Sequence, residues 1–283
     1  MRLVVQGRSI TVAHLTHIHR LIGGNTQFMQ VGEFSYYLPI QISGQTHDVE
    51  VVKTFCTEQK IDCALVSDNQ RLSHFGLCVM DMDSTLIAIE CIDEIADMMQ
   101  LKLQVSEITQ RSMKGEIDFA VSLKQRVALL KGLPETALQR VIDERLKFSP
   151  GAHEWIAACR ANNIKTVVAS GGFTFFANYV KSTLGLDYAV SNTLEIVDGK
   201  LTGAVLGDIV DEHRKAAELI KLRDQLGLKI DQTIAIGDGA NDLKMMHAAG
   251  VGVAYHAKAV VQEKATYAIN FNGLDAIAGL FTA

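Results

Sequence analysis

A short apolar strand that ends in two carboxylates constrains this sequence more than any other feature. The run Leu77–Met80 is followed at once by Asp81, Met82 and Asp83. Because side chains alternate along a strand, Asp81 and Asp83 leave its end on one side and Met82 on the other. Two like charges this close repel each other unless a cation or a proton is held between them. The pattern indicates a cation site at a strand end or, as the alternative, an aspartate pair that caps the following helix.

A second apolar strand ends in the same way. The run Thr233–Ile236 leads into the turn Gly237–Asp242, which carries Asp238 between two glycines. Glycines on both sides of an aspartate allow a sharp turn and a close approach of the backbone to a ligand. Taken alone, the segment could equally be an ordinary turn rich in Gly, Asn and Asp. Together with Asp81 and Asp83, it predicts oxygen ligands for a hard cation such as Mg²⁺.

A third strand-to-loop junction lies between these two in the chain. The strand pattern Lys165–Ala169 runs into Ser170, Gly171 and Gly172, ahead of a helical pattern. A hydroxyl beside glycine amides is a small cradle for an anion, although Ser-Gly-Gly is also common loop chemistry. In parallel α/β sheets, ligands bind beyond the carboxyl ends of the strands. We therefore expect Asp81, Ser170 and Asp238 to converge on one site.

The alternation of strand and helix patterns predicts an α/β protein with a Rossmann-like parallel sheet, covered on both faces. Strands are expected at 76–85, 166–169, 188–191, 233–236 and 251–254. Apolar spacings near three and four over 91–149 predict a helical cap inserted into this core, so that 73–90 and 150–283 form the core itself. Residues 1–72, with strand patterns at 2–5, 34–42 and 63–66, predict a small separate α+β domain.

Composition and charge limit the partners that we expect. The chain of 283 residues has a formal net charge of −5 and no basic run, whereas a nucleic-acid partner requires a basic face. It also lacks an apolar stretch of membrane-helix length and a signal-peptide pattern, so we expect a cytoplasmic protein without a membrane partner. Its five widely spaced cysteines predict buried, reduced thiols. The histidines His14, His17 and His19 predict a solvated helix face rather than a metal cluster, because no cysteine or acidic ligand accompanies them.

Taken in order, these motifs resemble those of the haloacid dehalogenase superfamily. The resemblance rests on Asp81–Thr85, Ser170–Gly172, Lys215 and Gly237–Asp242, and it covers about Gly76 to Lys264. It implies a Mg²⁺-dependent hydrolase of small phosphomonoesters. It does not extend over the first seventy or so residues. In related enzymes that region is often similar to amino-acid-binding regulatory modules, so its role stays open.

The resemblance implies chemical roles for the acidic residues. Asp81 would be the nucleophile that forms an aspartyl-phosphate, and Asp83 would protonate the departing oxygen and later deprotonate the attacking water. The metal would be held by the Asp81 carboxylate, the Asp83 main-chain carbonyl and Asp238. Asp242 would support the metal ligands from behind.

The resemblance also implies phosphate-binding groups. The Ser170 hydroxyl, the Gly171 amide and Lys215 would bind phosphoryl oxygens and offset their charge. Asn241 would orient a phosphate oxygen or the lysine. From the sequence alone, Lys215 reads equally well as a solvated residue near a helix start.

Four further residues bear on the substrate. By the resemblance, Glu90 would receive an ammonium group and Arg126 would bind a carboxylate, although each could otherwise form a surface salt bridge. Met113 and Phe119 would be apolar cap residues that exclude water from the closed site, or else plain core. A phosphate site with one anionic and one cationic receptor describes a phosphorylated amino acid. The resemblance implies hydrolysis of O-phospho-L-serine, as in serine biosynthesis.

Two alternatives stay open at this point. One is a related enzyme that acts on another small phosphomonoester, such as phosphothreonine, or that transfers the phosphoryl group to a second alcohol. The other is a regulatory amino-acid-binding protein that has kept the fold. The intact Asp81, Asp83, Lys215 and Asp238 weigh against the second, because a retired site tends to lose residues that repel one another. The sequence leaves open whether the chain acts as a monomer or a homodimer.

Overall fold

A central sheet organises the computed structural model, which describes residues 1–22, 27–40 and 46–281. Within these residues, the order of its strands is β11-β10-β9-β5-β6-β7-β8. Neighbours from β11 to β7 pair in parallel, and β8 alone is antiparallel to its neighbour β7. The strands are β5 (Leu77–Met80), β6 (Lys165–Phe173), β7 (Tyr188–Val197), β8 (Lys200–Leu206), β9 (Thr233–Gly237), β10 (Val251–Tyr255) and β11 (Tyr267–Ile269). The predicted parallel α/β core is confirmed.

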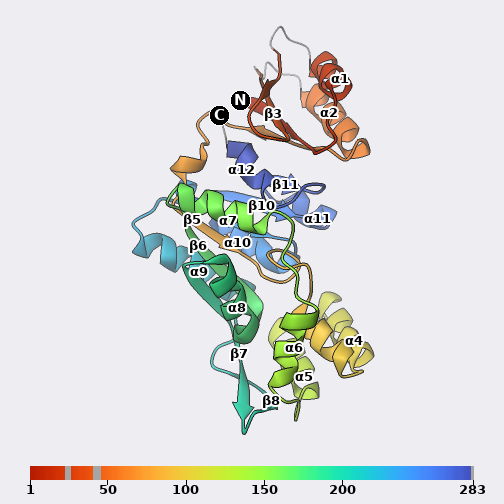
Figure 1. The fold of residues 1–283 in the computed structure, drawn as a ribbon, viewed down its shortest axis with the longest axis vertical. Helices are drawn as coiled ribbons and strands as arrows, with labels where there is room; N and C mark the ends of the chain where they lie inside the picture. Colours follow the sequence, from red (N-terminus) through yellow and green to blue (C-terminus); the bar gives the residue numbers. More distant parts are fainter. Residues whose placement is uncertain (23–26, 41–45, 282–283) are drawn as a thin grey trace.

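Helices cover both faces of this sheet (Figure 1). Every residue of β5, β9 and β10 is buried, as expected for strands that are packed on both sides. Along β5, Cys78 and Met80 join one hydrophobic cluster, whereas Leu77 and Val79 join another. The first cluster includes residues of α7 (Ala152–Ala161), α8 (Thr174–Leu184) and α12 (Ala276–Phe281). The second includes residues of α9 (Glu212–Gln225), α10 (Leu243–Ala248) and α11 (Ala259–Gln262).

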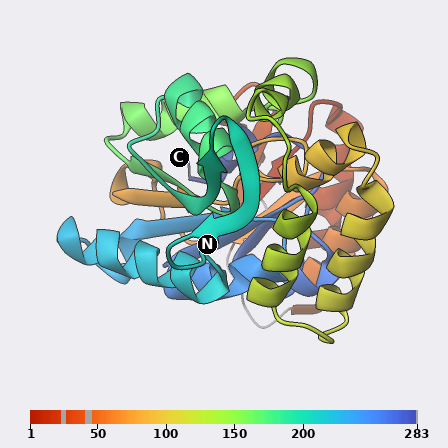
Figure 2. The ribbon, with the colours of Figure 1, turned by 90° about the horizontal axis from the view of Figure 1, so that it is seen from below.

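A group of helices between β5 and β6 in the chain forms the cap. It consists of α3 (Cys91–Met98), α4 (Lys102–Met113), α5 (Phe119–Leu129) and α6 (Thr136–Glu144). Asp118 caps α5, since its carboxylate accepts a hydrogen bond of 2.7 Å from the Val121 amide. Figure 1 shows these helices, in yellow and green, at the end of the molecule away from the N-terminal sheet, and Figure 2 views the molecule from that end.

The hairpin β7–β8 joins the cap, which the sequence analysis did not foresee. The Gly132 amide donates to the Leu201 carbonyl at 2.7 Å, and the Leu201 amide donates to the Leu133 carbonyl at 2.8 Å. The turn of this hairpin holds Asp198 and Gly199 at positive φ, 51° and 70°. An Asp-Gly pair in this conformation is a frequent two-residue hairpin turn.

The N-terminal part forms a second, antiparallel sheet, whose strand order within the described residues is β2-β3-β1-β4. Its elements are β1 (Arg2–Gln6), α1 (Val12–Ile22), β2 (Met29–Gln30), β3 (Ser35–Pro39), α2 (Thr46–Glu58) and β4 (Asp62–Val66). Leu3 and Val5 pack with residues of α1 and α2, whereas Val4 joins the cluster that contains α12. The α+β prediction is therefore confirmed, and one face of this sheet lies against the core.

Several strand boundaries differ from the sequence-based prediction. The strand expected over 76–85 ends at Met80, because the amides of Thr85 and Ile87 both donate to the Met82 carbonyl and turn the chain. The strand expected over 34–42 covers Ser35–Pro39, and residues 41 and 42 lie outside the described residues. Strand β8 and the short strands β2 and β11 were not expected.

The cysteines and the histidines of α1 can now be placed in the fold. Four of the cysteines are buried and Cys63 is half-buried, all as free thiols. The rings of His14 and His17 lie beside Phe55 of α2, with centroids 6.2 and 4.4 Å away. Among the described residues, no helix is long and apolar enough to cross a membrane.

Candidate active site

Three central strands deliver the candidate residues to one edge of the sheet. Strand β5 pairs with β6 on one side and with β9 on the other, so their carboxyl ends lie together. Asp81 follows β5, Ser170 lies near the end of β6, and Asp238 follows β9. Residues that are far apart in the sequence therefore meet, as the three strand-end motifs predicted.

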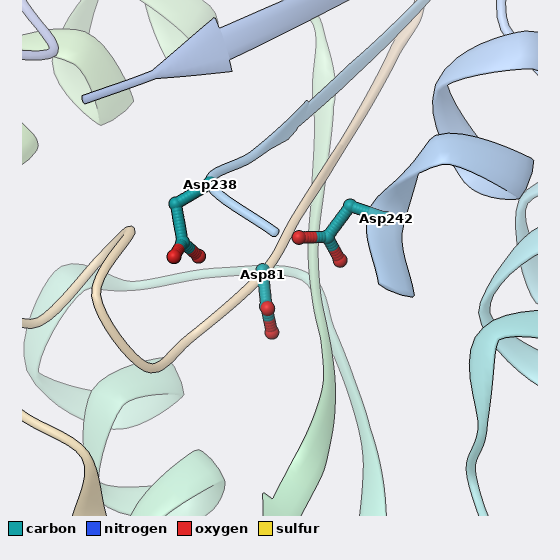
Figure 3. Close-up of side chains that lie close together, drawn as sticks. All are labelled: Asp81, Asp238 and Asp242. Atoms are coloured by element: carbon teal, nitrogen blue, oxygen red, sulfur yellow. The ribbon is translucent and has the colours of Figure 1, made fainter. Parts of the chain in front are cut away.

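An acidic cluster lies at this edge. Asp81, Asp238 and Asp242 each offer a carboxylate oxygen, and these atoms all lie within 4.8 Å of one another. In Figure 3, Asp81 lies between Asp238, at the end of its strand, and Asp242, beside a helix. Three hard oxygen donors without a histidine or cysteine fit a divalent cation such as Mg²⁺ better than zinc.

Lys215 is buried within this cluster. Its side chain is 1% exposed, and its Nζ lies 2.8 Å from Asp81 Oδ1 and 2.8 Å from Asp242 Oδ1. Although burial opposes it, the charges of Asp242 and Asp81 raise the pKa of Lys215 above its usual range. The lysine is therefore charged, and the alternative of a solvated residue is wrong.

Burial and mutual repulsion shift the pKa values of the other two carboxyl groups of the cluster. Burial and the charge of Asp81 raise the pKa of Asp238 to about 6, and the same two causes raise that of Asp242 to about 7. A lysine that contacts only two of these carboxylates leaves a surplus of negative charge. The cluster therefore favours the binding of a further cation.

Two hydrogen bonds hold the Asp83 carboxylate next to the cluster. Its Oδ1 accepts from the Cys91 amide at 2.8 Å, and its Oδ2 accepts from the Ser170 hydroxyl at 3.4 Å. Burial, followed by the charge of Asp81, raises the pKa of Asp83 to about 6, against the effect of the Cys91 amide. A carboxyl group with this pKa can give and take a proton near neutral pH. Its main-chain carbonyl as a metal ligand stays a prediction.

The segment Ser170–Gly172, expected to be a loop after the strand, is the irregular last part of β6 and is tightly held. Ser170 is 1% exposed, and its Oγ accepts a hydrogen bond of 2.8 Å from the Gly172 amide. A β-carbon on Gly171 would lie 2.8 Å from the Phe119 ring. Phe119 therefore reaches from the cap onto this segment, and the close contact requires a glycine.

Glu90, at the start of α3, and Arg126, on α5, both lie near Asp83. The Ser84 hydroxyl donates to Glu90 Oε1 at 2.8 Å. The Glu90 side chain is open to solvent, yet the desolvation of its position and the charge of Asp83 raise its pKa to about 8. Arg126 of α5 is half-buried. Its own burial lowers its pKa, although the negative charges of Asp93 and Glu90 act in the opposite direction. The two side chains thus place a carboxyl group and a guanidinium group beside the site.

Two predicted residues lie at the periphery. Met113 is 68% exposed, so the alternative that it is plain core is wrong; its water-excluding role stays a prediction. Asn241 is exposed in the short 3-10 helix Ala240–Asp242. Its side chain lies beside Gly239, since a β-carbon there would meet Asn241 Oδ1.

Two hydroxyl groups that were not predicted from the sequence hold site residues. Thr85 is fully buried and donates to Asp238 Oδ1 at 3.2 Å. Ser84, at a positive φ of 54°, orients Glu90. Both lie within the Asp81–Thr85 motif, but which side chain each would hold depends on segments that are distant in the sequence.

Comparison with known proteins places this site in a family. Residues 78–247 match the model of the haloacid dehalogenase-like hydrolases. A phosphoserine phosphatase of Haemophilus influenzae is 44% identical to this chain, over 99% of the chain and 88% of the relative. The chain belongs to the phosphoserine phosphatases of the haloacid dehalogenase-like hydrolase family. The family model leaves out the first seventy residues, as the motif resemblance did, whereas the match to the Haemophilus influenzae relative spans 99% of the chain and includes them.

Solved structures agree with membership in the phosphoserine phosphatases. The crystal structure of a probable phosphoserine phosphatase from Vibrio cholerae, in its unliganded form, is 42% identical, with a TM-score of 0.86, and covers 99% of this chain and 86% of its own. A structure described as a phospho-aspartyl intermediate analogue of phosphoserine phosphatase is 40% identical, with a TM-score of 0.67, over 72% of this chain and 97% of its own. Enzymes of this family are metal-dependent, and the acidic cluster of this chain fits that requirement.

Proposed function

We propose that this enzyme hydrolyses O-phospho-L-serine to L-serine and phosphate. The observation that carries the proposal is that the carboxyl group of Glu90 and the guanidinium group of Arg126 both lie near Asp83, next to the buried pair of Lys215 and Asp81. An amino acid carries an ammonium and a carboxylate, and the two receptors match these groups. The named activity of the Haemophilus influenzae relative supports this choice of substrate.

In the first half-reaction, Asp81 attacks phosphorus and the bond to the serine oxygen breaks. Its Oδ1 accepts hydrogen bonds from the Met82 amide at 2.7 Å and from Lys215 at 2.8 Å. Oδ2 is the oxygen that we propose as the nucleophile. Asp83 gives its proton to the departing serine oxygen, so L-serine leaves as the neutral alcohol.

In the second half-reaction, Asp83 removes a proton from water, which attacks phosphorus and releases Asp81. The Ser170 hydroxyl, the Gly171 amide and Lys215 bind the phosphoryl oxygens and offset their charge in both steps. Asn241 orients one of these oxygens from the rim. Phe119 and, once the cap has closed, Met113 exclude bulk water.

A divalent cation, which we propose is Mg²⁺, would be held by Asp81, Asp238 and the Asp83 carbonyl. When bound, it would neutralise the charge that develops on the phosphoryl oxygens. Asp242 positions Lys215 and supports the ligands from behind. The free cysteines fit a cytoplasmic enzyme, and a role in serine biosynthesis follows from the proposed products.

Release of phosphate and serine from phosphoserine, by the wild type and by Asp81→Asn, tests this function. The wild type with Mg²⁺ should yield the two products in equal amounts. Asp81→Asn should lose at least about a thousandfold in kcat while its melting temperature shows an intact fold. Equal rates for the two proteins, with contamination and deamidation excluded, would refute Asp81 as the nucleophile.

The alternatives need their own arms of the same assay. Faster turnover of phosphothreonine would identify the related phosphatase, and phosphate yields below serine yields in the presence of a second alcohol would identify a phosphotransferase. Serine binding without turnover of any of these substrates would identify a regulatory protein on the same fold. Membership in a hydrolase family with the acidic cluster intact favours the enzyme.

A further inference from the structure

Asn192 is a buried side chain of β7 that no sequence motif marks. It is 1% exposed, and both ends of its amide are used. Its Nδ2 donates to the Gly171 carbonyl at 2.8 Å, and its Oδ1 accepts from the Val210 amide at 2.8 Å. The residue therefore joins the last part of β6 to the segment that precedes α9.

The contact with Gly171 compensates for an irregularity in the sheet. The β6–β7 ladder pairs Ala169 with Val190, then shifts its register and resumes with Phe173 opposite Asn192. The extra residues on β6 bulge out, and a bulge leaves main-chain groups without their regular ladder partners. The Asn192 amide supplies a partner for one of them, so it fixes the position of Gly171.

The contact with Val210 fixes the start of α9. Asp211, the next residue, caps this helix by accepting a hydrogen bond of 2.8 Å from the Arg214 amide. Lys215 lies in the first turn, where its amide donates to the Asp211 carbonyl at 3.0 Å. Its ammonium then reaches Asp81 and Asp242. The position of the ammonium group therefore depends on where the helix begins.

A primary amide is suited to this place because it carries one donor side and one acceptor side. A carboxylate of the same shape would set an oxygen against the Gly171 carbonyl. The Asn192 main chain is itself held, since the Thr174 hydroxyl donates to its carbonyl at 3.0 Å. The amide is thus a fixed spacer between two segments.

We propose that Asn192 is a positioning residue that sets the spacing between the Gly171 amide and the Lys215 ammonium. These are two of the phosphate-binding groups, so the inference rests on the proposed function. Asn192 would act on the phosphate half of the substrate through Gly171 and Lys215, without touching the substrate. It would leave the half that binds the amino acid, at Glu90 and Arg126, unaffected.

Inhibition by each product separates these two halves. We would measure kcat, KM and the inhibition constants of phosphate and of L-serine for the wild type, Asn192→Ala and Asn192→Leu. Misplacement of catalytic groups by a fraction of an ångström to an ångström can cost about a hundredfold. We expect kcat/KM to fall by about 10 to 100-fold and the phosphate constant to rise by about tenfold. The L-serine constant should stay within about twofold, because its receptors lie elsewhere.

Asp187→Ala is the matched control. Asp187 joins the same two strands at their other end, where its carboxylate accepts from the Thr166 amide at 2.9 Å. This variant should lower the melting temperature without changing either inhibition constant. The proposal is overturned if the Asn192 variants behave as Asp187→Ala does, or if they weaken phosphate and serine equally. Thr174→Val, a milder change, should raise the phosphate constant alone if neither Asn192 variant folds, and an unchanged constant would likewise overturn the proposal.

Assays with p-nitrophenyl phosphate keep this inference separate from the identity of the substrate. If the wild type hydrolyses it but not phosphoserine, the proposed substrate is wrong. The Asn192 effect should still appear in the phosphate constant and in kcat/KM for p-nitrophenyl phosphate. If phosphoserine is hydrolysed and the Asn192 variants match the control, the positioning role alone is wrong.

Discussion

We expect two side chains, the Glu90 carboxyl group and the Arg126 guanidinium group, to determine the choice of substrate. Ser84 holds Glu90 through a hydrogen bond of 2.8 Å, and Arg126 is half-buried on α5. Removing one partner of a desolvated charge pair costs about 2 to 5 kcal/mol. At about 1.4 kcal/mol per decade, Arg126→Ala should lose roughly thirty-fold to a few thousand-fold in kcat/KM for phosphoserine.

Substrate analogues show whether Arg126 binds the carboxylate. Arg126→Ala should barely change the slow turnover of phosphoethanolamine, which has no carboxylate. Glu90→Gln should behave in the same way towards phospholactate, which has no ammonium. The two variants assayed on the three substrates form a cycle between protein and ligand groups. Equal losses on all three substrates would make Arg126 a structural or phosphate-site residue.

The fold and the residues delivered by single strands could be predicted from the sequence. Apolar runs placed Asp81, Ser170 and Asp238 at three strand ends, and parallel pairing brings such ends together. Asn192 could not be found in this way. Its partners, Gly171 and Val210, depend on a register shift that leaves no periodic signal. Lys215 was ambiguous for the same reason, since its burial is a tertiary property.

There are also physical reasons why some strands were not predicted from the sequence. The Asp198-Gly199 pair between β7 and β8 was a usable hairpin signal. Its attachment to the cap through Gly132 and Leu201 could not be read from local pattern. Strand β11 spans Tyr267–Ile269 alone, and so short a run carries too few residues to show a period.

Cap and core meet where the Phe119 ring covers Gly171. A methyl group at Gly171 would lie 2.8 Å from Phe119 Cζ, so Gly171→Ala should push the first turn of α5 away from the loop. We expect kcat/KM to fall by about tenfold or more through misplaced groups. The double variant with Phe119→Ala should recover part of this loss, because the clash is gone. An equal or greater loss in the double variant would show that the contact does not set the cap position.

At the scale of the whole molecule, one carboxylate joins the N-terminal sheet to the core. Asp62 of β4 is 3% exposed and accepts hydrogen bonds from the amides of Asn270, Phe271 and Asn272, at 2.7, 3.2 and 3.0 Å. The Asn272 side chain adds a fourth, at 2.8 Å. These four hydrogen bonds fix one arrangement of the N-terminal sheet and the core, because a movement of one against the other would leave the buried donors without an acceptor.

Asp62→Ala should therefore destabilise the protein by about 2 to 4 kcal/mol, since it leaves several buried donors without an acceptor. Urea unfolding followed by circular dichroism measures this change. Asp68→Ala is the matched control. Its carboxylate is 67% exposed and pairs with the N-terminal ammonium, so it should cost less than about 1 kcal/mol. Equal midpoints for the two variants would contradict the role given to Asp62.

The acidic cluster makes the stability of the whole molecule depend on pH and on metal together. Asp238 and Asp242 have pKa values raised to about 6 and about 7, above the unfolded value near 4. The metal-free native state therefore binds more protons than the unfolded state between about pH 4 and 7. Below this window the groups are protonated in both states. As pH rises through it, the native state loses protons unfavourably, so stability falls.

A divalent cation reverses this loss, because it binds the deprotonated carboxylates of the native state alone. The rise in melting temperature on adding Mg²⁺ should therefore be larger at pH 8 than at pH 5. A Mg²⁺ concentration a hundredfold above the dissociation constant stabilises the protein by about 2.7 kcal/mol at pH 8, whereas protons compete for the carboxylates at pH 5.

Calorimetry in buffers of different ionisation enthalpy should detect proton release on Mg²⁺ binding near pH 6.5 and little at pH 8.5. Asp238→Asn, which removes one ligand, should show a much smaller shift at both values. A Mg²⁺ effect of the same size at pH 5 and pH 8 would mean that the cation binds away from these carboxylates.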